Sequence, residues 1–167
     1  GEFLRVNVPG SVRDRLRRSL HTGDYLRRYL AVVRGTPDPL SGAVDLGIAR
    51  DPDHGSRRRI SPDGAPSRTE YETLASAGGL SLLRVTPRTG RTHQIRVHLA
   101  AIGCPLAGDG LYGTETGLIG RPALHAASLQ LKHPITGERI DARAPLPEDL
   151  QRLIAQAFGS AGSVGFF

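Results

Sequence analysis

A short polar stretch near the middle of the chain brings anion-binding side chains to the expected start of a helix. It reads Arg88-Thr89-Gly90-Arg91-Thr92-His93-Gln94-Ile95-Arg96-Val97-His98. The glycine allows a turn before the helix, and the free backbone N–H groups of a helix N-terminus attract anions. Arg91, His93 and Arg96 gather at this end, so the stretch could hold a phosphate or a carboxylate. The alternative is a solvated, basic helix start without a ligand.

Other chemistries fit the sequence less well. His93 and His98 do not share one face of a helix, and no His-Glu-x-x-His pattern or suitably spaced carboxylate accompanies them, so we expect no metal site. The chain also has no Gly-x-Ser-x-Gly, P-loop or Gly-x-Gly-x-x-Gly element. The single cysteine, Cys104, cannot form an internal disulfide, which fits a protein of the reducing cytoplasm.

The patterns around this stretch predict the elements that must position it. A helix is expected over residues 92–102, with Thr92 as its N-cap and Gly103 at its end. Alternating residues predict a hairpin over 68–87 that turns at Gly78-Gly79. Further strands are expected at residues 3–8, 29–33, 124–131 and 138–144, and helices at 12–20 and after Pro147. Residues 50–67 read as a long polar loop or an extended hairpin.

Together these elements predict an α+β protein with a mixed, mostly antiparallel sheet and few flanking helices. The 167 residues suit one globular domain, which we place at residues 1–158, followed by a flexible tail at 159–167. No apolar run is long enough to span a membrane.

The charge balance favours a polyanionic partner. The formal net charge is +6, and Lys132 is the only lysine among 22 basic residues. Arginine suits phosphate because its planar guanidinium makes paired hydrogen bonds. A genome with GC-rich codons would also favour arginine whatever the function, but the net positive charge still makes a nucleic acid a plausible partner.

Several segments share the order and spacing of one family's motifs: Arg28-Tyr29-Leu30-Ala31-Val32-Val33, Thr69-Glu70-Tyr71, Thr89 to Leu99, Ala101 to Gly113, Leu124-His125-Ala126, His133 to Glu138 and Ala144-Pro145-Leu146-Pro147. Over about residues 3–155 the chain resembles the RluA-type pseudouridine synthases. The resemblance implies a long, mostly antiparallel sheet with a central cleft. It also implies isomerisation of uridine to pseudouridine in structured RNA (rRNA or tRNA), without a cofactor. Such enzymes flip the target base out of its stack before the chemistry. Independently of the resemblance, we expect a monomer without a bound metal.

The resemblance also implies roles for individual residues. Tyr29 matches the cleft tyrosine that stacks on the flipped uracil and helps to take the C5 proton. Arg96 matches the arginine that pairs with the nucleophilic aspartate. Leu124 matches an apolar residue of the uracil pocket, or is a plain core leucine. Arg91 and His93 either contact RNA phosphate or brace the turn.

Other polar residues are expected to have lesser roles. His125 and His133 are expected to be structural. The run Arg57-Arg58-Arg59 could contact RNA, although such a run is more often a solvated loop.

The family's nucleophile is missing from this sequence. It belongs to an Arg-Leu-Asp-x-x-Thr-Ser-Gly stretch upstream of a strand like residues 3–8, and no Arg-Leu-Asp occurs in the 167 residues, which also contain no methionine. We take Asp109 as structural and Asp24 and Asp45 as turn residues. The chain alone is therefore expected to be inactive, with Arg96 left as an unpaired cation.

Three hypotheses follow from the sequence. The chain is the catalytic domain of a pseudouridine synthase without its N-terminal segment, a non-catalytic RNA-binding paralogue or inactive fragment of the same fold, or a basic interaction protein unrelated to RNA. The series of motifs disfavours the third. An Arg-Leu-Asp stretch in the upstream coding sequence would favour the first over the second.

Overall fold

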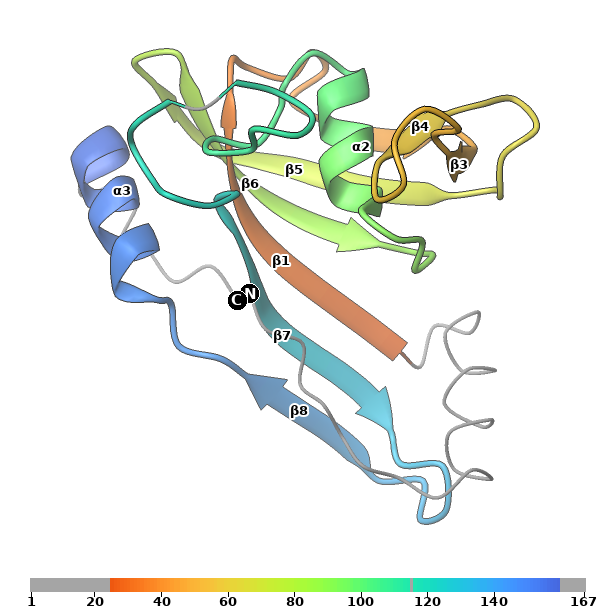
Figure 1. Cartoon of the computed structure of the whole chain (residues 1–167). Helices are drawn as coiled ribbons and strands as arrows, with labels where there is room; N and C mark the ends of the chain where they lie inside the picture. The colour runs from red at the N-terminus through yellow and green to blue at the C-terminus, as the bar shows by residue number, and fades with distance from the viewer. Residues whose placement is uncertain (1–24, 115, 160–167) are drawn as a thin grey trace.

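A computed structural model describes residues 25–114 and 116–159 of the chain (Figure 1). Six strands form one sheet in the order β2-β5-β6-β1-β7-β8, and every pairing in it is antiparallel. Its strands are β1 (Tyr25–Arg34), β2 (Ser41–Asp45), β5 (Arg68–Ala77), β6 (Leu80–Pro87), β7 (Leu124–Lys132) and β8 (Arg139–Arg143). A two-stranded sheet pairs β3 (Ile48–Arg50) with β4 (Arg58–Ile60). The helices are α2 (Gln94–Ala101) and α3 (Glu148–Phe158).

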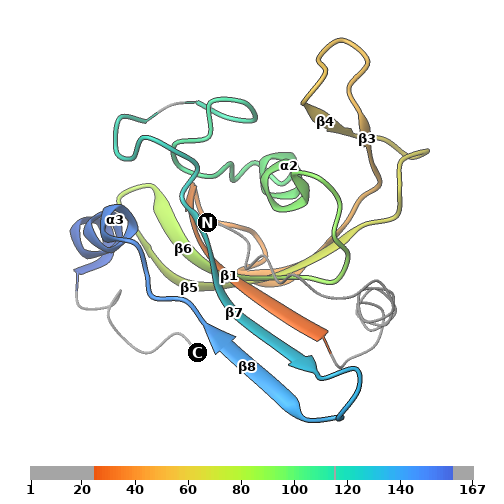
Figure 2. The same ribbon diagram turned by 60° about the horizontal axis from the view of Figure 1, so that its bottom comes forward.

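The central strand β1 faces a different core on each side. Its residues alternate between the two faces of the sheet, as strand geometry requires. Tyr29, Ala31 and Val33 pack with residues of α2, including Ile95 and Leu99. Leu30 and Val32 pack instead with residues of α3, namely Leu150, Leu153, Ile154 and Phe158. Figure 2 shows the two helices far apart, with the central strands between them.

Two strands of the sheet carry one residue more than their partners. In β7, Ser128 pairs with Arg28 but Ala126 pairs with Tyr29, so Ala127 is the additional residue. In β5, Thr73 pairs with Leu83 and Ala75 with Leu82, so Leu74 is additional. Such β-bulges bend a strand and increase its local twist.

Most of the expected elements are present. The hairpin over 68–87 is β5–β6, and its turn residues Gly78 and Gly79 both have positive φ, 59° and 78°, which glycine adopts without steric cost. The extended-hairpin interpretation of residues 50–67 is confirmed by β3–β4, and α3 follows Pro147. The α+β class is confirmed as well. None of the described helices is long and apolar enough to cross a membrane.

Some details differ from expectation. Thr92 is not the N-cap of α2, because the helix begins at Gln94 with His93 at the cap position. The edge strand β2 was not expected, since its short sequence Ser-Gly-Ala-Val-Asp lacks an apolar alternation. The strand at 29–33 starts earlier, at Tyr25. The predicted strand at 3–8, the predicted helix at 12–20 and nearly all of the predicted tail lie outside the described residues.

Candidate active site

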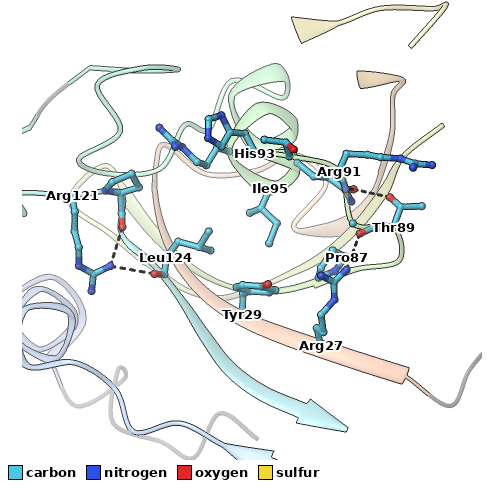
Figure 3. A pocket seen from close by; sticks show the side chains of 14 residues that line it. Arg27, Tyr29, Pro87, Thr89, Arg91, His93, Ile95, Arg121 and Leu124 are labelled. Carbon is cyan, nitrogen blue, oxygen red and sulfur yellow. Dashed lines mark hydrogen bonds between the residues drawn. The ribbon is translucent and has the colours of Figure 1, made fainter. Parts of the chain in front are cut away.

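A cavity of about 550 Å³ lies over the α2 face of the sheet, within the usual size range for small-ligand pockets (Figure 3). Strand β1 supplies Arg27 and Tyr29, and the segment at the start of β7 supplies Leu124. The remaining walls come from the loop between β6 and α2, the first residues of α2, and the loop before β7. All five residues singled out in the sequence line this one pocket: Tyr29, Arg91, His93, Arg96 and Leu124.

Tyr29 lies at the base of the pocket and is only 6% exposed. In Figure 3 the apolar side chains of Ile95 and Leu124 stand next to its ring. Burial raises the pKa of the Tyr29 hydroxyl, and the nearby Arg27 guanidinium opposes this effect through its charge. An aromatic ring between two aliphatic side chains forms an apolar slot suited to a flat heterocyclic base. Leu124 thus lines the pocket and also packs against the core.

Arg96 has a carboxylate partner, which corrects the expectation that it would be unpaired. Its Nε donates to Oδ2 of Asp109 at 2.9 Å and its Nη2 to Oδ1 at 2.8 Å. Asp109 is fully buried, and its Oδ1 also accepts the backbone N–H groups of Leu111 and Tyr112 at 3.2 and 3.3 Å. Burial alone would raise the pKa of Asp109, but the hydrogen bonds and charge of Arg96 hold it below the ordinary value. Asp109 is therefore a structural residue that orients Arg96.

His93 links the pocket rim to the β3–β4 hairpin. It has φ of 56°, a left-handed conformation uncommon for a residue with a side chain, and its Nδ1 lies 2.7 Å from the Tyr112 hydroxyl. That hydroxyl accepts the backbone N–H of Arg58 at 2.8 Å, so its own hydrogen is free to be donated to His93. Nδ1 of His93 can then act as the acceptor, which is the arrangement of a neutral imidazole. Burial lowers the pKa of His93, and the charges of Arg96 and Arg58 lower it further.

Gln94 fixes the loop that forms the pocket rim. Its Oε1 accepts from the Thr89 hydroxyl at 2.7 Å and from the Arg91 backbone N–H at 3.1 Å. Its Nε2 donates to the Arg68 carbonyl and to the Thr69 hydroxyl, both at 2.9 Å. Every hydrogen-bonding capacity of this buried amide is thereby used. Sequence reasoning assigned no role to Gln94, although it sits inside the polar stretch.

The network continues from Thr69 to a buried histidine. The Thr69 hydroxyl lies 2.7 Å from Nδ1 of His98, whose Nε2 lies 2.8 Å from the Leu46 carbonyl. A carbonyl only accepts, so Nε2 is the donor and Nδ1 accepts from Thr69. Burial lowers the pKa of His98, consistent with this neutral form. His98 therefore has a structural role and does not line the pocket.

The pocket is strongly cationic. Arg27, Arg91, Arg96 and Arg121 line it, and none of the described acidic residues does. Two of these arginines form ion pairs with carboxylates that do not line the pocket. Arg96 pairs with Asp109, and Arg121 forms a bidentate pair with Asp149 at 2.9 and 3.0 Å.

The other two arginines bind neutral oxygens. Arg27 donates to the Thr89 carbonyl at 2.9 Å, and Arg91 donates to the Pro66 carbonyl from Nε at 3.2 Å and from Nη2 at 3.0 Å. The pocket therefore keeps positive charge available for an anion.

Among the described residues, no side chain is a convincing nucleophile. The Asp109 carboxylate is saturated by hydrogen bonds, and Asp45 ends β2, where it pairs with Arg68 away from the pocket. Asp24 lies outside the described residues. Within the described ranges, His, Cys, Asp and Glu side chains also form no group of three that could hold a metal ion.

The remaining polar residues from the sequence fall elsewhere. His125 lies 3.2 Å from the Ala144 carbonyl through Nε2, and His133 accepts the backbone N–H groups of Ile135 and Thr136 in the β7–β8 turn. The Arg57 guanidinium lies over the Tyr112 ring, 5.7 Å from its centroid, on the side of the hairpin near the pocket rim.

Comparison with known proteins identifies the family. A model of the RNA pseudouridylate synthase family matches residues 10–101. The chain belongs to this family. The match confirms the family that the sequence motifs indicated.

Relatives and solved structures agree with this assignment. The chain is 46% identical over 134 residues to the uncharacterized RNA pseudouridine synthase YhcT of Bacillus subtilis, covering 79% of this chain and 44% of that protein. It is 41% identical over 148 residues to the ribosomal large subunit pseudouridine synthase D of Nitrosomonas europaea, covering 83% and 43%. The chain thus spans less than half the length of these curated relatives.

The fold resembles the human RNA Pseudouridylate Synthase Domain Containing 1, with a TM-score of 0.70 and 26% identity over 87% of this chain and 65% of that one. It likewise resembles the human RNA Pseudouridylate Synthase Domain Containing 4, with a TM-score of 0.69 and 23% identity over 89% and 68%.

Proposed function

We propose that this chain forms the base-binding wall of the active site of an RNA pseudouridine synthase, which isomerises uridine to pseudouridine in structured RNA. The observation that carries the proposal is the convergence of Tyr29, Leu124 and Arg96 on one cationic pocket from three separate segments. We propose ribosomal RNA as the substrate class, because relatives such as the Nitrosomonas protein carry that name. The enzyme would act in the cytoplasm as a monomer and without a cofactor.

The pocket suggests how the chain's own residues would serve this reaction. A uracil flipped out of the RNA would enter the slot formed by Tyr29, Ile95 and Leu124. The backbone phosphates of its nucleotide would then lie near Arg91 at the rim. The reaction breaks the bond between C1′ and N1 and forms one between C1′ and C5. C5 loses a proton and N1 gains one, so the atoms balance without a co-reactant. The group we assign to accept the C5 proton is the Tyr29 oxygen in its phenolate form.

Arg96 would orient the nucleophilic aspartate of the family, which is not among these 167 residues. The pair with Asp109 uses Nε and Nη2 of Arg96, and Nη1 makes no hydrogen bond among the described residues. This edge of the guanidinium could therefore receive a second carboxylate. The nucleophile would then meet a cation that is already held in a fixed orientation, which is the preorganisation that electrostatic catalysis requires.

Release of tritium from C5-labelled uridine tests the proposal. The 167-residue chain should release none, whereas the same chain extended by its upstream coding sequence should release tritium from ribosomal RNA. Release by the 167-residue chain would show that another nucleophile exists. If the extended protein carried the Arg-Leu-Asp stretch and still released none from any RNA, the synthase assignment would be wrong. RNA binding without release would then favour the non-catalytic paralogue.

A further inference from the structure

Arg27 lies next to Tyr29 in the pocket but had no role in the sequence interpretation. The two residues are separated by one position on β1, so their side chains lie on the same face of the sheet. Figure 3 shows Arg27 extending alongside Tyr29 toward the loop that carries Pro87 and Thr89. The loop packs closely on it, since a Cβ added to Gly90 would come within 3.4 Å of Nη2 of Arg27.

The Arg27 guanidinium is held in place by the loop between β6 and α2. Nη2 donates to the Thr89 carbonyl at 2.9 Å. The Thr89 hydroxyl in turn donates to Gln94 at 2.7 Å and accepts the backbone N–H of Arg68 at 3.0 Å. Arg27 is thus held by the same saturated network that holds the pocket rim.

No carboxylate among the described residues neutralises the charge of Arg27. Its oxygen partner is a neutral carbonyl, and none of the ion pairs among the described residues includes it. Its Nε is buried and has no hydrogen-bond partner within residues 25–114 and 116–159. A buried guanidinium nitrogen left in this state costs stability, so packing alone does not explain an arginine here.

We propose that Arg27 is a positioning residue for Tyr29: the guanidinium of Arg27 places a fixed positive charge beside the phenol, stabilises the phenolate and so raises the fraction of Tyr29 that can accept a proton. The inference rests on the proposed function only in its catalytic consequence. A nearby cation stabilises the phenolate relative to the phenol, and it does so more strongly in a pocket shielded from water.

Several groups act on the pKa of Tyr29. Burial has the largest effect and raises it, the charge of Arg27 lowers it, the phenol of Tyr25 raises it, and a side-chain hydrogen bond from Arg27 lowers it. Other ionisable groups face the pocket from the neighbouring elements: Arg91 from the rim, His93 and Arg96 from the start of α2, and Arg121 from the loop before β7. A test must therefore vary Arg27 while leaving these groups in place.

Fluorine NMR of the 167-residue chain tests the charge directly and needs no RNA. Fluorinated tyrosine replaces the four tyrosines and lowers their titration range, and Tyr29→Phe assigns the resonance. Arg27→Gln should move the titration midpoint of residue 29 to higher pH, and Arg27→Lys should leave it near the wild-type midpoint. Arg28→Gln removes a neighbouring charge from the opposite face of the strand and should change nothing.

An unchanged midpoint in Arg27→Gln would overturn the proposal, and so would an equal shift in Arg28→Gln. Thermal unfolding gives a second readout, because the buried Nε predicts that Arg27→Met will not lower the melting temperature. A clear loss of stability would point to a purely structural role.

Kinetics of the extended, active protein provide the functional readout. Arg27→Gln should lower kcat with little change in KM, by less than removing the Tyr29 hydroxyl does, and Arg27→Lys should recover much of the loss. A raised KM with unchanged kcat would instead mark Arg27 as an RNA contact and overturn the proposal. If the extended protein made no pseudouridine at all, the proposed function would fail while the NMR result would still decide the role of the charge.

Discussion

Breaking the pair between Arg96 and Asp109 from its two ends should have unequal consequences. The Asp109 side chain is fully buried, whereas that of Arg96 is 22% exposed. Arg96→Met leaves a carboxylate in the interior with only two long backbone hydrogen bonds, 3.2 and 3.3 Å. Asp109→Asn leaves a guanidinium that can still reach water through its exposed edge.

Removing one partner of a buried pair typically costs 3–5 kcal/mol, so we expect about 4–5 kcal/mol for Arg96→Met and about 3 kcal/mol for Asp109→Asn. The double variant should be no less stable than Arg96→Met, because no uncompensated charge remains in it. Urea denaturation of the four proteins at pH 7.5 measures these differences as a double-mutant cycle.

The same reasoning makes the cost pH-dependent. The folded-state pKa of Asp109 is lowered, so in the wild type the pair stabilises the fold above the ordinary range of aspartate and is lost as pH falls through the folded-state pKa. In Arg96→Met the lone carboxylate can take up a proton, so its cost should shrink as pH falls toward 5. The proposed role of burial would be refuted if the destabilisation of the double variant equalled the sum of those of the two single variants. It would also be refuted if Asp109→Asn lost more stability than Arg96→Met.

Four further predictions concern the network, the hairpin, the tyrosine and RNA. Burial lowers the pKa of His98, so as the pH falls the unfolded state takes up the proton before the folded state does. The free energy of unfolding should therefore decline below about pH 6.5, and less so in His98→Gln. Urea denaturation at several pH values measures this, and the same dependence of the unfolding free energy on pH in both proteins would contradict it. Tyr112→Phe removes both hydrogen bonds of the hydroxyl and should cost about 1–2 kcal/mol; hydrogen exchange at the Arg58 amide should accelerate, and unchanged protection there would rule out the link between hairpin and rim. In the extended protein, Tyr29→Phe should bind RNA normally but turn over slowly, since the ring is kept and only the proton acceptor is lost; a wild-type single-turnover rate would leave stacking as its only role. RNA affinity should fall with salt by about 0.7 log units per log unit for each phosphate contacted in single strands; filter binding with a flat salt response would argue against an electrostatic interface.

Local sequence signals were sufficient for much of the sheet. The β5–β6 hairpin follows from alternation around Gly78-Gly79, and α3 follows from the spacing of its apolar residues after Pro147. Such signals act between neighbours in the chain, so a single sequence carries them in full. The five candidate site residues can also be named from the sequence, and the structure brings them to one pocket, although their individual roles stay predictions.

Features that depend on distant partners were missed. Cap preference favours Thr92 over His93, but the hydrogen bond to Tyr112, 19 positions away, accompanies the left-handed conformation of His93 at the cap. The expectation of an unpaired Arg96 was wrong for the same reason, since no short-range rule connects it to Asp109 in the loop beyond α2. The edge strand β2 owes its existence to pairing with β5 more than to its own residues.

The bulges at Leu74 and Ala127 have a consequence for how the length of this chain can vary in evolution. Elsewhere in the sheet, losing one residue would turn every following side chain of that strand to the opposite face. Loss of either additional residue instead leaves a regular ladder in which each neighbour keeps its partner and its face. What would change is the bend of the strand, and for the bulge at Ala127 in β7 also the angle at which Leu124 approaches Tyr29. Single-residue deletions among homologues should therefore collect at these two points, and a deletion at Ala127 would alter the shape of the pocket while every wall residue is kept.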